Sequence, residues 1–317
     1  MLGSVSQPTV AGKIGRYTFL EGQVHIRYPD LPRQGPEPDG DTVTFQPRDR
    51  AALLRLRRFG TRGPEINKRA MARIRFEGVD ALETHFRETH QDLEFANAAR
   101  DSVLRALGFR NVKFWDDLPN KVESVNSDWQ SGYALAIGID PHGRLIAQLF
   151  AADRRPPCAT GKKHGDRVWV TPKDLDQSLN MALLRGGLAY GEFYSTMPFE
   201  LARHMARRVE SARQAKRGLW PKEHVNRRRT ATIANLAAAE SKILWPKLFR
   251  RLAAYFLEGN LGLGAFDAWL REDPINRDDL IVLPSGEQAN MHNLVQVQGN
   301  RIRMRYDPED LVILPDP

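Results

Sequence analysis

The sequence contains a single cysteine, Cys158, among its 317 residues. One cysteine cannot form an internal disulfide, and it cannot supply a thiolate cluster for a metal. Stability must therefore come from packing, for which the 41% of hydrophobic residues is sufficient.

Long hydrophobic runs are also missing, since no uninterrupted apolar segment is long enough to span a bilayer. Residues 1–8 lack the basic segment and apolar stretch that mark a secretory signal peptide. We therefore expect a cytoplasmic protein with no membrane partner.

Charge of the two signs is unequal, with 47 Lys and Arg against 39 Asp and Glu and a net charge of +8. A positive balance favours anionic partners, nucleic acid above all, although many basic proteins bind none. The charge therefore supports a nucleic-acid partner without establishing one.

Two short stretches combine acids with a guanidinium, at residues 39–42 and 75–83. Asp41 and Asp80 carry hard oxygen ligands of the kind that Ca²⁺ or Mg²⁺ prefers. Hydrolysis of a phosphodiester needs such cationic charge on the phosphate oxygens, together with an activated water. The two stretches together therefore indicate a nuclease.

The second stretch also contains the other groups that this chemistry requires. Glu83 can orient or deprotonate a water, and the Arg75 guanidinium can form paired hydrogen bonds with phosphate oxygens. Two alternatives stay open: the first stretch is also an ordinary Asp-Gly turn, and the charged residues together could form a surface ion-pair network.

The hydrophobic periodicity predicts strands first and helices afterwards. We expect an α+β fold, a small β-barrel with helices packed on it. A basic insertion at about 47–70 should hold a short helix, and its charges are either a nucleic-acid contact or a solvated face. The expected elements are a hairpin at 16–28 that turns at Glu21-Gly22, strands at 42–46 and 71–79, a helix at 91–107, a hairpin at 132–151, and helices at 171–186 and 199–216.

After Pro221 the pattern changes to a separate unit, so we predict domains at 1–220 and 221–317. An alanine-rich helix should end near Trp245, a second should begin at Pro246, and a third should cover 266–270. Three short strands at 279–284, 301–306 and 310–315 are expected to form one small sheet. The arginines on the middle strand either bind nucleic acid or protect an exposed edge; they are Arg301, Arg303 and Arg305.

Five motifs in the right order make the chain resemble the staphylococcal nuclease, or thermonuclease, family over about residues 12–220. They are the Asp-Gly-Asp-Thr turn at 39–42, the segment at 75–83, the Asp-Pro-His-Gly-Arg hairpin turn at 140–144, the helix end Leu-Leu-Arg-Gly-Gly-Leu-Ala at 183–189, and the closing Ala-Arg-Gln-Ala-Lys-Arg-Gly-Leu-Trp at 212–220.

The resemblance implies an OB-type five-stranded barrel with three helices, and an endonuclease that cuts DNA and RNA with Ca²⁺ to leave 3′-phosphate ends. Mg²⁺ or Mn²⁺ are the other metals considered. Carried over by position, the implied metal ligands are Asp41, Asp80 and the backbone carbonyl of Ala81, with Asp39 in the outer shell. The implied catalytic residues are Arg75 and Arg144, which bind phosphate, and Glu83, which activates water.

This sequence departs from the family pattern at several positions. Ala81 and Leu82 replace a threonine and a proline, and Pro141 removes a lysine expected near the terminal phosphate. His142 stands where the family often has an aromatic residue against the nucleotide, and either Phe193 or Tyr194 is expected to supply a stacking face for a base.

The leading hypothesis is thus a metal-dependent nuclease, and the rival is an OB-fold module that binds nucleic acid without cutting it. The rival predicts that some of the site carboxylates or arginines are lost. All six are present in this sequence: Asp39, Asp41, Arg75, Asp80, Glu83 and Arg144. For the C-terminal extension we expect regulation, targeting, self-association or a protein partner.

Overall fold

The computed structural model describes residues 15–272 and 279–315, and its centre is a closed β-barrel. Strand β1 pairs with both β2 and β7, which closes the ring β1-β2-β3-β8-β7, and β3 and β8 are its parallel pair. The expected α+β fold with a five-stranded barrel is confirmed. The strands are β1 (Gly15–His25), β2 (Thr42–Pro47), β3 (Ala72–Phe76), β7 (Trp129–Ile139) and β8 (Leu145–Ala151), with β9 (Arg167–Val170) added beside the start of β1.

The predicted hairpin at 16–28 is wrong, because β1 runs straight through Glu21-Gly22. From Gly22 to His25 the strand pairs with β7 on one side and with β2 on the other, so it bends around the barrel instead of turning back. A Cβ at Gly22 would lie 2.3 Å from the Gln46 carbonyl oxygen. The glycine that suggested a turn therefore permits a close approach between strands.

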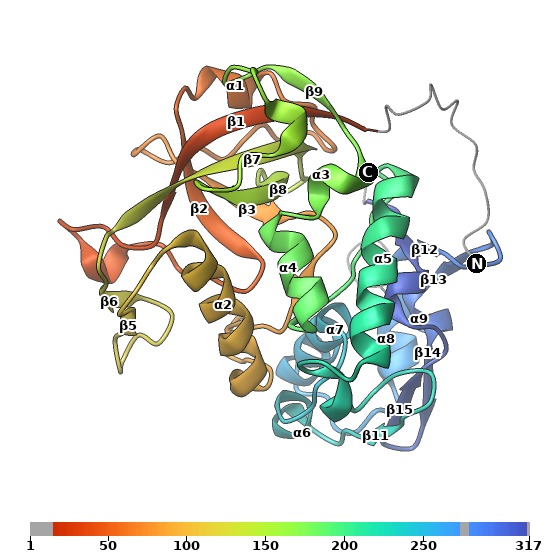
Figure 1. Cartoon of the computed structure of the whole chain (residues 1–317). Coiled ribbons are helices and arrows are strands. Elements are labelled where there is room, and N and C mark those ends of the chain that lie inside the picture. The colour runs from red at the N-terminus through yellow and green to blue at the C-terminus, as the bar shows by residue number, and fades with distance from the viewer. Residues whose placement is uncertain (1–14, 273–278, 316–317) are drawn as a thin grey trace.

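Helices cover one end of the barrel, where Figure 1 shows α2 and α4 below the strands and α5 to their right. Asp92 caps α2 by accepting from the Phe95 amide at 3.2 Å, and Gly108 ends it with φ of +100°. The expected single helix at 171–186 is wrong, because Ser178 caps a new helix there. The bounds are α1 (Ala51–Leu54) in the basic insertion, α2 (Leu93–Leu107), α3 (Pro172–Leu175), α4 (Leu179–Gly186) and α5 (Phe199–Gln214).

Two short strand pairs lie outside the barrel. One joins β4 (Asp80–Ala81) to β10 (Ala189–Tyr190), and the other joins β5 (Lys113–Phe114) to β6 (Val122–Ser124). The first pair fixes the segment after β3 against the segment after α4.

The C-terminal elements form a helical unit with two small sheets, ordered β11-β15-β14 and β13-β12-β16. The expected single sheet is therefore wrong, since the strand at 301–304 pairs apart from the other two. The alanine-rich helix is also much shorter than expected. The bounds are β11 (Ala231–Thr232), α6 (Leu236–Glu240), α7 (Pro246–Leu257), α8 (Phe266–Glu272), β12 (Leu280–Val282), β13 (Gln288–Asn290), α9 (Met291–Leu294), β14 (Val295–Gln298), β15 (Arg301–Met304) and β16 (Val312–Ile313).

This unit packs directly on the barrel and its helices, as the lower right of Figure 1 shows. The Ile313 amide donates to the Phe193 carbonyl at 2.8 Å, and the Ser195 amide donates to the Ile313 carbonyl at 2.9 Å. Arg213 on α5 pairs with Glu309 at 3.0 Å. Buried apolar residues form one cluster that runs from Tyr17 in β1 to Ile313 in β16.

No helix within residues 15–272 and 279–315 has the length and apolarity to cross a bilayer. The first residues, on which the expectation of no signal peptide rests, lie outside the described part of the chain.

Glu77 follows β3 and is buried beneath the barrel end. Its carboxylate accepts from the Tyr17 hydroxyl at 3.0 Å and from the Gln148 amide at 3.2 Å. Burial raises its pKa to about 7 from 4.5, against the lowering effect of those hydrogen bonds.

We predict that Glu77→Gln removes a pH-dependent loss of stability. A carboxyl whose pKa is higher in the folded chain adds stability that is fully present below pH 4.5 and lost as the pH rises through about 7. As the pH rises from 4.5 to 8, the free energy of unfolding of E77Q should therefore increase relative to that of wild type by roughly 3 kcal/mol, the free energy that corresponds to the rise of the Glu77 pKa to about 7. Urea unfolding at each pH measures this difference. The control variant E123Q, at an exposed acid, should show the same pH dependence of stability as wild type. The same pH dependence in E77Q and wild type would contradict the prediction.

Candidate active site

A cavity of about 1500 Å³ opens between the barrel and the C-terminal unit. Its walls come from the end of β3, the turn between β7 and β8, the segment after β10, and α7. Among the residues that line it are Asp39, Asp41, Arg75, Glu83, His142, Arg144, Glu192, Tyr194, Lys247, Arg250 and Arg251.

The barrel register brings Asp41, Arg75 and Asp80 together. Arg75 on β3 pairs across the sheet with Thr42, the residue after Asp41. Its guanidinium donates to Asp41 Oδ2 at 2.7 Å and to Asp80 Oδ1 at 2.8 Å. Both aspartates are almost fully buried. Two segments 39 residues apart in sequence, at Asp41 and Asp80, thus meet through one arginine.

Ala81 and Asp39 lie against the same pair. The Ala81 amide donates to Asp41 Oδ2 at 3.0 Å. Asp39 accepts from the Gly40 amide at 2.7 Å and from the Thr84 hydroxyl at 3.1 Å. Its pKa rises to about 7 because of burial and the neighbouring Asp41 charge.

Gly40, between the two aspartates, is a position with no room for a side chain. A Cβ at this position would lie 2.5 Å from the Cβ of Ala81 and 2.9 Å from the Cβ of Ala99. The Asp-Gly-Asp turn can therefore approach β4 and α2 only because its middle residue has no side chain.

Glu83 follows β4 and reaches the cavity, where its side chain is 15% exposed. Burial raises its pKa to about 7, with an opposing effect from Arg250. Its carboxylate accepts from Arg250 Nη1 at 2.5 Å. The residue expected to activate water is thus paired with a cation from the C-terminal unit.

Arg144 lies just before β8 and lines the same cavity, but its Nε donates to Asp140 Oδ2, 2.7 Å away. Among the described residues no hydrogen bond or ion pair joins it to Asp41 or Asp80. The structure therefore brings Arg144 to the site without placing it on the carboxylates.

The three expected stacking residues differ in access. His142 and Tyr194 line the cavity, and the Tyr194 hydroxyl accepts from Lys247 Nζ at 3.1 Å. Phe193 is 2% exposed and packs in the core, so its ring presents no open face to a base.

Sequence reasoning missed the residues that α7 sends into the site. Arg250 donates to both oxygens of Asp80, at 3.1 Å and 3.3 Å, as well as to Glu83. The Lys247 amide at the start of α7 donates to Asp80 Oδ2 at 3.2 Å. The Lys247 ammonium and Arg251 both pair with Asp279, at 3.1 Å and 2.9 Å.

A faint signal for these residues exists in the sequence. Positions 247, 250 and 251 have the i, i+3, i+4 spacing of one helix face, on a helix that is otherwise mostly apolar. The pattern shows a basic stripe, but it does not show that the stripe faces the acids of the barrel.

Glu192 was also missed, and no spacing or motif pointed to it. It follows β10 and accepts from Arg75 Nη2 at 2.9 Å, and it lies 3.6 Å from both Lys247 Nζ and Arg250 Nη2. Its side chain is 2% exposed. Glu192 therefore joins the barrel arginine to the two cations of α7.

Asp80 is the most enclosed member of the cluster, with no exposed side-chain surface. Burial by itself would raise its pKa, but Arg250 and Arg75 lower the pKa below the ordinary aspartate value. Asp80 is therefore held as a carboxylate by the two guanidinium groups.

Comparison with known families gives one result for this region. Residues 73–222 match the family model described as staphylococcal nuclease homologue. The match includes Arg75, Asp80, Glu83 and Arg144, whereas Asp41 precedes it and α7 follows it. No curated protein sequence matches the chain.

We predict that Glu192→Gln destabilises the fold. Removing one partner of a buried charge cluster leaves the remaining charges uncompensated, which costs about 3 kcal/mol or more. Urea unfolding at pH 7 measures the loss. The variant E94Q, at an acid whose side chain is 71% exposed, should change stability little. Equal midpoints for E192Q and E94Q would show that Glu192 does not hold the cluster together.

Proposed function

Because the chain carries a domain of the staphylococcal nuclease homologue family, we propose that it is a metal-dependent nuclease that hydrolyses phosphodiester bonds of DNA or RNA. The observation that supports this most is the contact of Arg75 with both Asp41 and Asp80 at the wall of an open cavity. It combines oxygen ligands for a cation with a guanidinium for a phosphate, in a site with room for a substrate.

In this proposal, Arg75 and Arg144 bind the phosphate together, since β3 pairs with β8 at Ile74 and Leu145, the neighbours of the two arginines. Guanidinium groups suit this task because they form paired, charge-assisted hydrogen bonds with phosphate oxygens. Glu83 accepts the proton of the attacking water. His142 and Tyr194 line the approach and offer rings on which bases can stack.

The donor set suits Ca²⁺, the metal we propose, with Mg²⁺ and Mn²⁺ as the alternatives to test. Asp41, Asp80 and the Ala81 carbonyl would hold the ion, with Asp39 behind Asp41, since all of these are hard oxygen donors. A bound cation supplies charge that stabilises the developing negative charge on the phosphate. Within the described residues, however, no three His, Cys, Asp or Glu side chains are arranged as a metal site.

Further parts of the proposal rest on the sequence alone. We propose endonucleolytic cleavage that leaves 3′-phosphate ends, and action in the cytoplasm. We also propose that residues 1–220 form the nuclease domain and that 221–317 form a second unit, which completes the wall of the site and could hold a protein partner or a second copy of the chain.

Purified protein incubated with labelled single- and double-stranded DNA and RNA tests the activity, with Ca²⁺, Mg²⁺, Mn²⁺ or EDTA. We expect cleavage that depends on the metal and products that carry a 3′-phosphate. Binding without cleavage under every metal condition would instead favour the rival, a nucleic-acid-binding OB-fold module.

We predict that Glu83→Gln lowers the cleavage rate by roughly 10²- to 10⁴-fold, because an amide cannot accept the proton of the attacking water. Single-turnover cleavage measures this, with circular dichroism to confirm folding. The variant E88Q, at an exposed acid five residues away, should retain the wild-type rate. An E83Q rate equal to wild type would remove Glu83 from the chemistry.

A further inference from the structure

Arg250 contacts Asp80, one of the proposed metal ligands. Its guanidinium contacts both oxygens of Asp80 and one oxygen of Glu83, and it lies 3.6 Å from Glu192. We propose that Arg250 is a built-in competitor of the divalent cation, so that the ion binds only when this side chain leaves Asp80. The inference rests on the proposed metal-dependent function and specifies how the C-terminal unit controls it.

The hydrogen bonds of Asp80 explain why the two cations exclude each other. Arg75 and Arg250 donate to Oδ1, and Arg250 and the Lys247 amide donate to Oδ2. Both oxygens that an ion would need are thus already engaged. A divalent ion on the same oxygens would also be repelled by the guanidinium beside it.

Of the two arginines on Asp80, Arg250 is the one that can leave. Arg75 has three carboxylate partners, Asp41, Asp80 and Glu192, at 2.7 to 2.9 Å. The Arg250 contacts to Asp80 are longer, at 3.1 Å and 3.3 Å, and its short contact, at 2.5 Å, is with Glu83, which is not among the proposed metal ligands. Longer charge-assisted hydrogen bonds are weaker, so displacement of Arg250 is the less costly of the two.

The movement must be that of a side chain, because α7 itself is firmly held. Trp245, Leu248, Phe249 and Leu252 are at most 1% exposed, and each buried side chain of this kind contributes roughly 1.5–3 kcal/mol. The Gln91 side chain also donates to the Leu244 carbonyl at 3.0 Å, just before the helix. Arg250 lines the cavity and is 17% exposed, so its long side chain can rotate into open space.

Calorimetric titration of the full-length protein with Ca²⁺, without nucleic acid, tests the competition. Arg250→Gln should bind Ca²⁺ about tenfold more tightly than wild type or better, since charged hydrogen bonds of this kind are worth about one factor of ten or more. The matched control is Arg251→Gln, which removes the same charge from the next residue but from a guanidinium that pairs with Asp279. R251Q should bind Ca²⁺ like wild type.

A second measurement keeps the test valid if R250Q is unstable. The melting temperature of R250Q should rise more with Ca²⁺ than that of wild type, and an unfolded R250Q should refold when Ca²⁺ is added. Equal Ca²⁺ affinity of R250Q and wild type would overturn the competition while leaving a metal-dependent nuclease intact. Absence of both Ca²⁺ binding and cleavage in wild type and R250Q would instead reject the proposed function itself.

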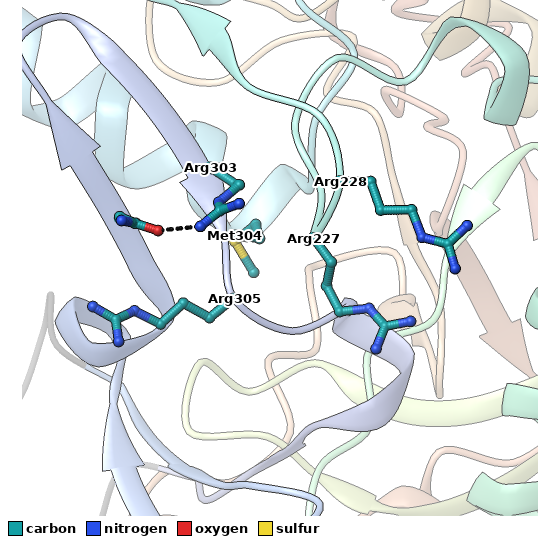
Figure 2. A pocket seen from close by; sticks show the side chains of 6 residues that line it. Arg227, Arg228, Arg303, Met304 and Arg305 are labelled. Carbon is teal, nitrogen blue, oxygen red and sulfur yellow. Dashed lines mark hydrogen bonds between the residues drawn. The ribbon is translucent and has the colours of Figure 1, made fainter.

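A separate observation concerns a shallow basic groove of about 490 Å³ on the C-terminal unit. Figure 2 shows the guanidinium groups of its arginines at separate points along the opening. We infer that this groove binds the phosphate backbone of nucleic acid, outside the catalytic cavity. The residues that line it are Arg227, Arg228, Gln296, Arg303, Met304 and Arg305.

Two of these arginines have side chains that no described residue holds in place. Arg227 pairs with Asp307 at 2.8 Å, and Arg303 donates to the Gln296 side chain. The side chains of Arg228 and Arg305 are exposed, and no ion pair or hydrogen bond joins them to any described residue. Cations spread along a groove suit the repeating charges of a polyanion better than a single phosphate group.

The double variant R228Q/R305Q tests this groove by fluorescence anisotropy with labelled DNA and RNA in EDTA. Affinity should fall for every sequence, and the slope of log K against log salt should become shallower by about 1 to 2. R105Q/R207Q removes two exposed charges elsewhere and should keep the wild-type slope. Equal slopes for the two double variants, or competition by polyglutamate but not by nucleic acid, would overturn the inference.

Discussion

The fully buried carboxylate of Asp80 is the constraint on which this site depends. A buried carboxylate is costly unless it is paired and hydrogen-bonded. Arg75 from the barrel and Arg250 from α7 supply the charges, and the amide of Lys247 supplies a further hydrogen bond. Asp80 thereby also accepts a hydrogen bond from the Lys247 amide, which has no partner within its own helix and lies 167 residues further along the chain. One side chain therefore joins the two halves of the molecule.

This arrangement makes the C-terminal unit a part of the candidate active site. The family match ends at residue 222, yet Arg250, whose guanidinium contacts both Asp80 and Glu83, lies on α7 beyond that limit. Glu192 lies between the two sources of charge, within 3.6 Å of Lys247 and Arg250 and bonded to Arg75. The charge balance of these acids thus depends on residues of α7 that lie outside the matched region.

The barrel was predictable because its signals are local. Alternating strands and the helical spacing of apolar residues act over a few residues, and they predicted the strands at 42–46 and 71–79 and the helix at 91–107. The predictions were wrong where contacts between distant parts of the chain, and not the neighbouring residues, explain a residue or a strand pairing. Gly22 permits close approach of two strands rather than a turn, and the tail strands divide between two sheets because β15 pairs with β11 and β14.

The sequence by itself determined the fold class and the chemical types of the candidate site, since Asp41, Arg75, Asp80 and Glu83 stand in recognisable short motifs. Tertiary structure alone decided what those groups contact. Motif spacing describes neighbours along the chain, whereas the partner of Asp80 and Glu83 is Arg250, about 170 residues away. Only the packing of an apolar helix against the barrel brings that guanidinium to the acids, so only the folded chain shows that Arg250 contacts them.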